Sequence, residues 1–108
     1  MNLDAYIGRG NKRVITLLQG GAPVADNLVT RVVIWMGDVC IDSSVPADPI
    51  ELTNLGTTVE IQLGLWTEAT PGEVTGYMTV YTDGGAAEGY AWPEGEPLTI
   101  TFHEWGAL

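Results

Sequence analysis

The sequence has no lysine or arginine after Arg31, although twelve of its fourteen aspartate and glutamate residues follow that position. The four cations are Arg9, Lys12, Arg13 and Arg31, and the net charge is -10 over 108 residues. A charge of this size bears on association and solubility rather than on the fold. Because the acidic part repels phosphate backbones and anionic lipids, we expect no direct binding to nucleic acid or membranes.

Cysteine and long apolar runs are also scarce. The single cysteine, Cys40, cannot form an internal disulfide, and its apolar neighbours Val39 and Ile41 predict a small buried strand residue. No stretch approaches the length of a membrane span, and residues 1–4 do not begin a signal peptide. These absences favour a soluble protein that is made in a cytoplasm.

Helical periodicity is absent as well, because apolar residues alternate with polar ones. The clearest case is residues 98–104, where three alternate side chains share one face: Leu98, Ile100 and Phe102. Residues 58–63 and 76–82 alternate in the same way. Residues 13–18 and 31–36 are more continuously apolar, which is typical of central strands covered on both sides.

Turn-forming residues separate these segments about every ten residues, which is the spacing of a β-sandwich or small barrel. Residues 39–41 are predicted to pair back on the preceding strand, and residues 49–52 give a further short strand. Residues 77–82 and 87–92 flank a glycine-rich turn and predict a hairpin, with residues 98–104 returning beside it.

These segments predict an all-β protein, namely a single immunoglobulin-like β-sandwich of seven or eight mostly antiparallel strands. The sandwich is expected to span residues 12–108 as one domain. Residues 1–11 carry two glycines and little periodicity, so we expect a flexible N-terminal arm.

Catalytic and metal-binding patterns are weak. His103, the only histidine, is expected on the face away from the core, and no serine or cysteine accompanies it in a nucleophile motif. Asp38, Asp42 and Asp48 offer oxygen ligands for calcium, but their spacing is not that of an EF-hand, and a solvated loop is preferred. We predict that the protein is not an enzyme and has no cofactor.

Aromatic residues near the C-terminal end are the best candidates for a binding surface. Tyr77 and Tyr81 share one face of a predicted strand, Tyr90 and Trp92 share a face of its partner, and Trp105 follows the last strand. If these faces adjoin, they form a patch suited to a protein interface or to sugar stacking. A core position for about half of these rings stays open beside protein and carbohydrate contact.

A series of motifs runs through the strand-rich part of the sequence. A strand at 14–18 is followed by the turn Gly-Ala-Pro-Val at 21–24 and by a valine-rich strand at 28–34. Residues 72–81 and 98–102 continue the series. In this order the motifs resemble the immunoglobulin-like N-terminal domain of the baseplate upper proteins of tailed phages and related virion accessory proteins. The resemblance implies a structural protein and brings no catalytic residue with it.

The charge division and the resemblance together predict a non-enzymatic structural protein of a phage or prophage particle, in the tail, the baseplate or the capsid. It is expected to be made in the cytoplasm of the bacterial host, to reside in the virion, and to contact other virion proteins as a homo-oligomer or lattice. The predicted partner-binding residues are Arg9, Lys12, Arg13, Tyr77, Tyr81, Tyr90, Trp92 and Trp105. The alternatives are an acidic inhibitor that mimics nucleic acid and binds a host protein, or a carbohydrate-binding module.

Overall fold

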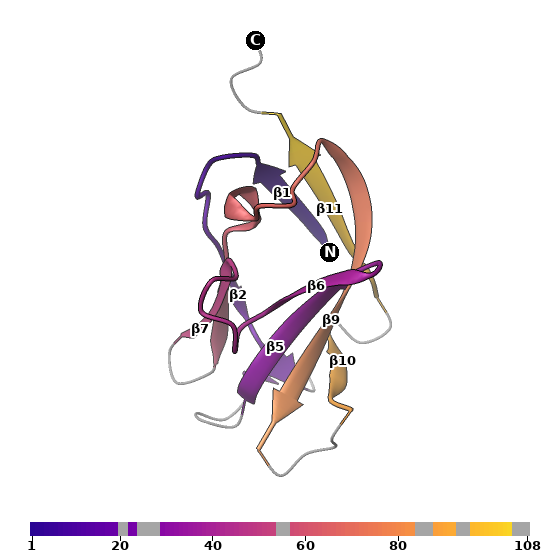
Figure 1. The fold of residues 1–108 in the computed structure, drawn as a ribbon. Helices are drawn as coiled ribbons and strands as arrows, with labels where there is room; N and C mark the ends of the chain where they lie inside the picture. The colour runs from indigo at the N-terminus through magenta and orange to yellow at the C-terminus, as the bar shows by residue number, and fades with distance from the viewer. Residues whose placement is uncertain (20–21, 24–28, 54–56, 84–87, 93–95, 105–108) are drawn as a thin grey trace.

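A computed structural model describes residues 1–19, 22–23, 29–53, 57–83, 88–92 and 96–104. These residues are largely strands, and the only helical element among them is the short 3-10 turn η2 (Leu63–Leu65) (Figure 1). No helix in this part of the chain is long and apolar enough to cross a membrane. The strands are β1 (Asn2–Tyr6), β2 (Arg13–Thr16), β3 (Leu18–Gln19), β4 (Ala22–Pro23), β5 (Val29–Met36), β6 (Val39–Asp42), β7 (Ile50–Thr53), β8 (Thr58–Ile61), β9 (Gly72–Thr82), β10 (Tyr90–Trp92) and β11 (Leu98–His103).

The larger sheet has six strands in the order β1-β11-β9-β5-β6, with β10 also paired to β9. β1 is parallel to β11, and the other pairings are antiparallel. The first half of the eleven-residue strand β9 pairs with β11, and its second half pairs with both β5 and β10. β9 therefore joins the two ends of this sheet.

The smaller sheet consists of β2, β8 and β7, all antiparallel, and β3 and β4 form a separate two-stranded pair. Figure 1 shows β2 and β7 on one side of the molecule and β5, β9 and β10 on the other. A single core cluster contains buried residues from both sheets, including Ile15, Val59, Ile61, Ile34 and Met78. The fold is thus all-β and compatible with a β-sandwich.

The predicted alternation is confirmed in the strands where it was clearest. In β11, Leu98, Ile100 and Phe102 are buried, whereas the residues between them are partly exposed. In β8, Val59 and Ile61 are buried on either side of the half-exposed Glu60. Alternate side chains of an extended strand point to opposite faces, so one face of each strand closes on the core.

Each of the eight segments predicted as strands contains a strand, and the predicted pairings are confirmed. β6 pairs back on β5, β10 forms a hairpin partner of β9, and β11 also pairs with β9. Three strands were not predicted: β1, β3 and β4. The pairings are mostly antiparallel, as expected.

Residues 13–18 do not form the central strand that their apolar run suggested. β2 pairs only with β8, and Val14 lies opposite Glu60 on the outer side, where it is 57% exposed. The apolar run predicted the strand correctly but not its position at the edge of the sheet. A single valine exposed to water is tolerated there, so an apolar residue does not by itself indicate a covered face. The same prediction holds for β5, where Val32, Val33 and Ile34 are fully buried.

The prediction of a flexible N-terminal arm over residues 1–11 is wrong for residues 2–6. They form β1, which pairs in parallel with β11, and Leu3 and Ala5 are buried in the core cluster. Beyond the strand, the amide of Ile7 donates to the carbonyl of His103 and the amide of Gly8 to the carbonyl of Gly64. The segment was missed because two buried residues give little periodicity and its partner strand is almost a chain length away.

Cys40 was predicted to be buried, but it is exposed. It lies between Val39 and Ile41 on β6; Ile41 is buried in the core cluster and Val39 packs against it. Apolar neighbours in sequence do not bury a strand residue, because they lie on the face opposite to it.

Replacing Leu3 with Ala tests the structural role of β1. Because Leu3 is 1% exposed, we expect the substitution to lower the free energy of unfolding by about 3 kcal/mol through lost burial and the cavity left behind. Val14→Ala, at a residue 57% exposed, is the control and should change it by less than about 0.5 kcal/mol. Urea unfolding followed by circular dichroism measures both, and equal small effects would mean that β1 does not belong to the cooperative fold.

Gly64 gives a second test of how the N-terminal segment is held. A Cβ atom at this position would overlap the main-chain oxygens of Tyr6 and Arg9, so the chain after β1 must move away. We expect Gly64→Ala to destabilise the protein by about 2 kcal/mol. At Gly10 the nearest atoms to an added Cβ belong to side chains at 3.4 Å, so Gly10→Ala should be nearly neutral in the same urea titration.

Candidate functional site

The rings predicted to form one aromatic patch lie on two sides of the β9–β10 pair. Residues directly opposite one another in an antiparallel pair point to the same face. Both rings of β10 are opposite buried residues of β9: Tyr90 opposite Val80, and Trp92 opposite Met78. Tyr77 and Tyr81 alternate with these buried residues and point away from the core. The two pairs of rings therefore do not adjoin, so the condition for a single patch of four rings is not met.

Trp92 has a structural position. Its side chain is half-buried and packs against the core cluster, and its indole Nε1 donates a hydrogen bond to the carbonyl oxygen of Leu18 at 3.2 Å. Tyr90 is 45% exposed at the start of the same strand. Trp105 lies outside the described residues. Of the predicted rings, Tyr77 and Tyr81 therefore belong to the outward side of the larger sheet.

An exposed aromatic surface lies on the outer side of β5, β6 and β9. Trp35 is directly opposite Tyr77 on β9 and opposite Cys40 on β6. Trp35 is 42% exposed and Tyr77 is 59% exposed. Thr79 and Tyr81 continue the same side along β9. We call this surface the Trp35 face; it consists of Trp35, Cys40, Tyr77, Thr79 and Tyr81.

Trp35 was missed as a candidate because it belongs to an apolar run. The alternation carried a signal, since Ile34 and Met36 on either side of it are buried in the core. Val33 points to the same side as Trp35 and is nonetheless fully buried, without belonging to the core cluster. The outer side of β5 is thus covered over Val33 and open at Trp35.

An ion pair lies beside the Trp35 face. Arg31 Nε is 3.0 Å from both carboxylate oxygens of Asp42, and Arg31 Nη2 is 2.5 Å from Asp42 Oδ2. The guanidinium carbon lies 4.9 Å from the centre of the Tyr81 ring, within the range of a cation–π contact. One arginine thus pairs with a carboxylate and stacks on an aromatic ring at the same time.

The pKa of Asp42 is lowered to about 2, chiefly because the Arg31 side chain hydrogen-bonds to its charged form. Burial acts in the opposite direction. The amide and the hydroxyl of Ser44 donate to Asp42 Oδ1 at 2.9 and 2.8 Å and lower the pKa further. The same pair raises the pKa of Arg31. The Asp42 side chain is 11% exposed, so these hydrogen bonds account for a charge that is held largely out of water.

The residues considered as calcium ligands hold the loop 43–49 instead. The amide of Asp42 donates to Asp48 Oδ2 at 2.9 Å, and the amide of Val32 donates to Ser43 Oγ at 2.9 Å. Asp38 lies in the turn between β5 and β6. Within the described part of the chain, no group of three histidine, cysteine or acidic residues is placed to hold a metal ion.

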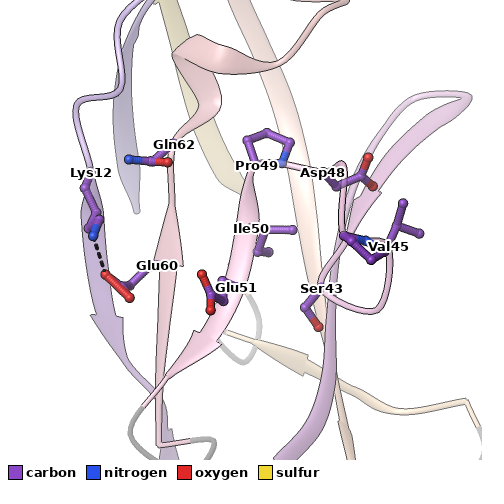
Figure 2. A pocket seen from close by; sticks show the side chains of 10 residues that line it. Lys12, Ser43, Val45, Asp48, Pro49, Ile50, Glu51, Glu60 and Gln62 are labelled. Atoms are coloured by element: carbon purple, nitrogen blue, oxygen red, sulfur yellow. Dashed lines mark ion pairs between the residues drawn. The ribbon is translucent and has the colours of Figure 1, made fainter.

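A polar cleft of about 500 Å³ is lined by this loop and by the smaller sheet (Figure 2). Its lining residues come from the loop, from β7 and β8, and from the positions just before β2 and just after β8: Lys12, Ser43, Val45, Pro46, Asp48, Pro49, Ile50, Glu51, Glu60 and Gln62. Lys12 Nζ lies 2.8 Å from Glu60 Oε1, and this hydrogen bond and charge raise the pKa of Lys12. The lining mixes both charges, and the one ion pair drawn in Figure 2 joins the residue before β2 to Glu60 on β8.

The predicted basic contact residues lie in different settings. Lys12 is engaged with Glu60, whereas Arg13 is exposed on the edge strand β2, and Arg9 is exposed beyond β1. A role for these residues in binding a partner stays a prediction.

His103 on β11 contacts side chains of β1. Its Nε2 is 3.0 Å from Asp4 Oδ1, and its ring stacks on Tyr6 with centroids 5.0 Å apart. No described serine or cysteine is hydrogen-bonded to this histidine, so the contacts seen are those of strand association rather than of an activated nucleophile.

Comparison with known proteins adds no relative. No protein-family model matches the chain, and no curated protein or solved structure is significantly similar to it. The candidate site therefore stands on the geometry of the described residues.

The Asp42 pair predicts a specific pH dependence. A carboxyl whose pKa is lowered from 3.8 to about 2 on folding stabilises the native state above pH 4, and this contribution is lost as the pH falls through about 2. We expect Asp42→Asn to be less stable than the wild type by about 2 kcal/mol at pH 7. The difference should narrow between pH 4 and pH 2 in urea titrations. A difference that stays constant over this range would contradict the assigned role.

Proposed function

We propose that this protein is a non-catalytic structural component of a phage or prophage particle, in the tail, the baseplate or the capsid, and that it acts through contacts with other virion proteins. The observation that carries the proposal is a division of roles among the side chains. Arg31 and His103 pair with carboxylates on neighbouring strands, whereas the large aromatic side chains of Trp35 and Tyr77 are left exposed on a sheet. Exposed rings with a polar surround are characteristic of protein interfaces.

The only histidine and the arginine of β5 are both engaged in contacts between strands. His103 is paired with Asp4 across β1 and β11, and Arg31 is paired with Asp42 across β5 and β6. An active site instead requires a nucleophile, a base and an orienting group converging on a substrate. The described residues give no such arrangement, which favours a protein that works by binding.

Assignment to a phage particle is supported by the order of the motifs. The segments that resemble baseplate upper proteins include residues 72–81 and 98–102, which fall within the paired strands β9 and β11. An immunoglobulin-like relation between the two sheets is part of the same proposal. Proteins of this kind occur in several copies per particle, so the exposed aromatic surface of each copy would be covered by a neighbouring virion protein.

The two alternatives have weaker support. A carbohydrate-binding module was expected to stack sugars on Tyr77, Tyr81, Tyr90, Trp92 or Trp105, and the first four of these lie on two sides of the sheet. A nucleic-acid mimic requires carboxylates in a row, whereas Asp83 and Glu88 lie beside the β9–β10 connection and not along a strand.

Particle purification tests the proposal. Particles released from the strain that encodes the protein, by infection or by prophage induction, are purified by density gradient and analysed by quantitative mass spectrometry. We expect the protein to band with the particles in several copies per particle and to remain after a salt wash. A protein that is abundant in the lysate but missing from the particle band would refute the assignment.

A further inference from the structure

We propose that the Trp35 face docks a segment of a partner protein that carries arginine side chains, whose guanidinium groups stack on Trp35 and Tyr77. The inference deepens the proposed function by naming the surface and the chemistry of the partner, and it rests on that function only in taking the partner to be a protein.

The first argument is the pairing of two exposed rings. Trp35 and Tyr77 are directly opposite each other on neighbouring strands, and side chains in this relation lie within contact distance. They are 42% and 59% exposed, and both point away from the core. The register of the two strands fixes the positions from which the two rings project. A planar group from outside can stack on these exposed rings without any change in the sheet.

The second argument is that the same surface already binds a guanidinium. Arg31 lies over the ring of Tyr81 at 4.9 Å while its nitrogens bond to Asp42. Tyr77 is two strand positions before Thr79 and four before Tyr81 on the same side of β9, but the ring of Tyr77 has no such described cation over it. The Trp35 face thus already has one guanidinium stacked on Tyr81, and the exposed rings of Trp35 and Tyr77 offer further surface on which arginine side chains from a partner can stack.

The third argument is charge complementarity. Asp38 lies in the turn joining β5 to β6, Asp83 follows β9, and Glu88 precedes β10, so carboxylates stand at both ends of the strands that build the face. All three are exposed. No lysine or arginine follows Arg31 in the chain, and Arg31 is committed to Asp42. The surround of the rings is therefore negative, and its natural partner is positive.

Arginine fits better than lysine, because its planar guanidinium stacks on aromatic rings and bonds to carboxylates through several donors at once. A separate protein fits better than a second copy, since two copies would each carry a charge of -10 and repel one another. The occupant is thus an arginine-bearing segment of another protein.

Peptide binding tests the inference directly. The probes are hexapeptides of arginine, lysine and glutamate, titrated into the full chain at physiological salt by calorimetry. We expect the arginine peptide to bind about fivefold more tightly than the lysine peptide, and Trp35→Ala and Tyr77→Ala each to weaken it about fivefold. Tyr90→Ala is the matched control, an exposed ring on the other side of the sheet, and should change the affinity less than about twofold.

Cys40 allows the same test on the unaltered protein. It is exposed, lies directly opposite Trp35 and is the one cysteine of the sequence. We expect a saturating arginine peptide to slow alkylation of Cys40 by iodoacetamide about threefold or more, because a segment stacked on Trp35 covers the thiol. An unchanged alkylation rate would count against the inference even if a ring variant had failed to fold.

Other outcomes would overturn the proposal. Equal affinity for arginine and lysine peptides, unaffected by Trp35→Ala, would indicate general attraction to an acidic protein. Glycan binding or self-association that is lost in Trp35→Ala, without peptide binding, would assign the face to another occupant. If the protein is found in particles while the peptide tests fail, only this inference fails; peptide binding by a protein absent from particles would refute the phage assignment alone.

Discussion

The alternation of side chains along β9 is the constraint on which both surfaces of the larger sheet depend. Met78 and Val80 point into the core, so Tyr77, Thr79 and Tyr81 must point outward. β5 and β10 pair with the same part of β9, so each of their side chains points to the same side of the sheet as the β9 residue opposite it. Packing of the core and exposure of the rings are thus two consequences of one register, and a shift of one residue would exchange them.

The Arg31–Asp42 pair links the Trp35 face to the loop beyond β6. Asp42 is the last residue of β6, and it accepts hydrogen bonds from Arg31 on β5 and from Ser44 in the loop. Its own amide donates to Asp48 further along that loop. A partly buried carboxylate is costly unless it is paired, and this one has a charged partner and two polar donors. The loop that borders the cleft is therefore held by the same residue that fixes Arg31 over Tyr81.

The local pattern of the sequence was enough to predict the strands, and it failed where the answer depended on distant partners. The alternation in β11 and β8 is visible within six residues, because it reflects one face meeting one core. β1 contributes only Leu3 and Ala5 to that core, and its partner lies at the opposite end of the chain. No local window contains that pairing. Strands with a clear local pattern and their pairings with strands close in sequence were therefore predictable, whereas β1 and its pairing with β11 were not.

The candidate site shows the same division. That Tyr77 and Tyr81 share a face follows from the period of a strand, and the structure confirms it. That Tyr90 lies on the other side depends on its register with Val80, which its own strand does not reveal. Trp35 was hidden by its apolar neighbours, because a run of five apolar residues does not show which of them is left uncovered by the adjoining strands.

The charge distribution and the rings contribute differently to binding. Lys12 and Arg31 are neutralised by internal partners, so beyond the N-terminal segment the surface is negative without local compensation. Such a field acts over about 10 Å at moderate salt and chiefly raises the rate of encounter with a positive partner. It decays too slowly with distance to select one site on the molecule. Selection falls to short-range contacts that need matched geometry, and on the described outer surface of β5, β6 and β9 those are the rings of Trp35 and Tyr77.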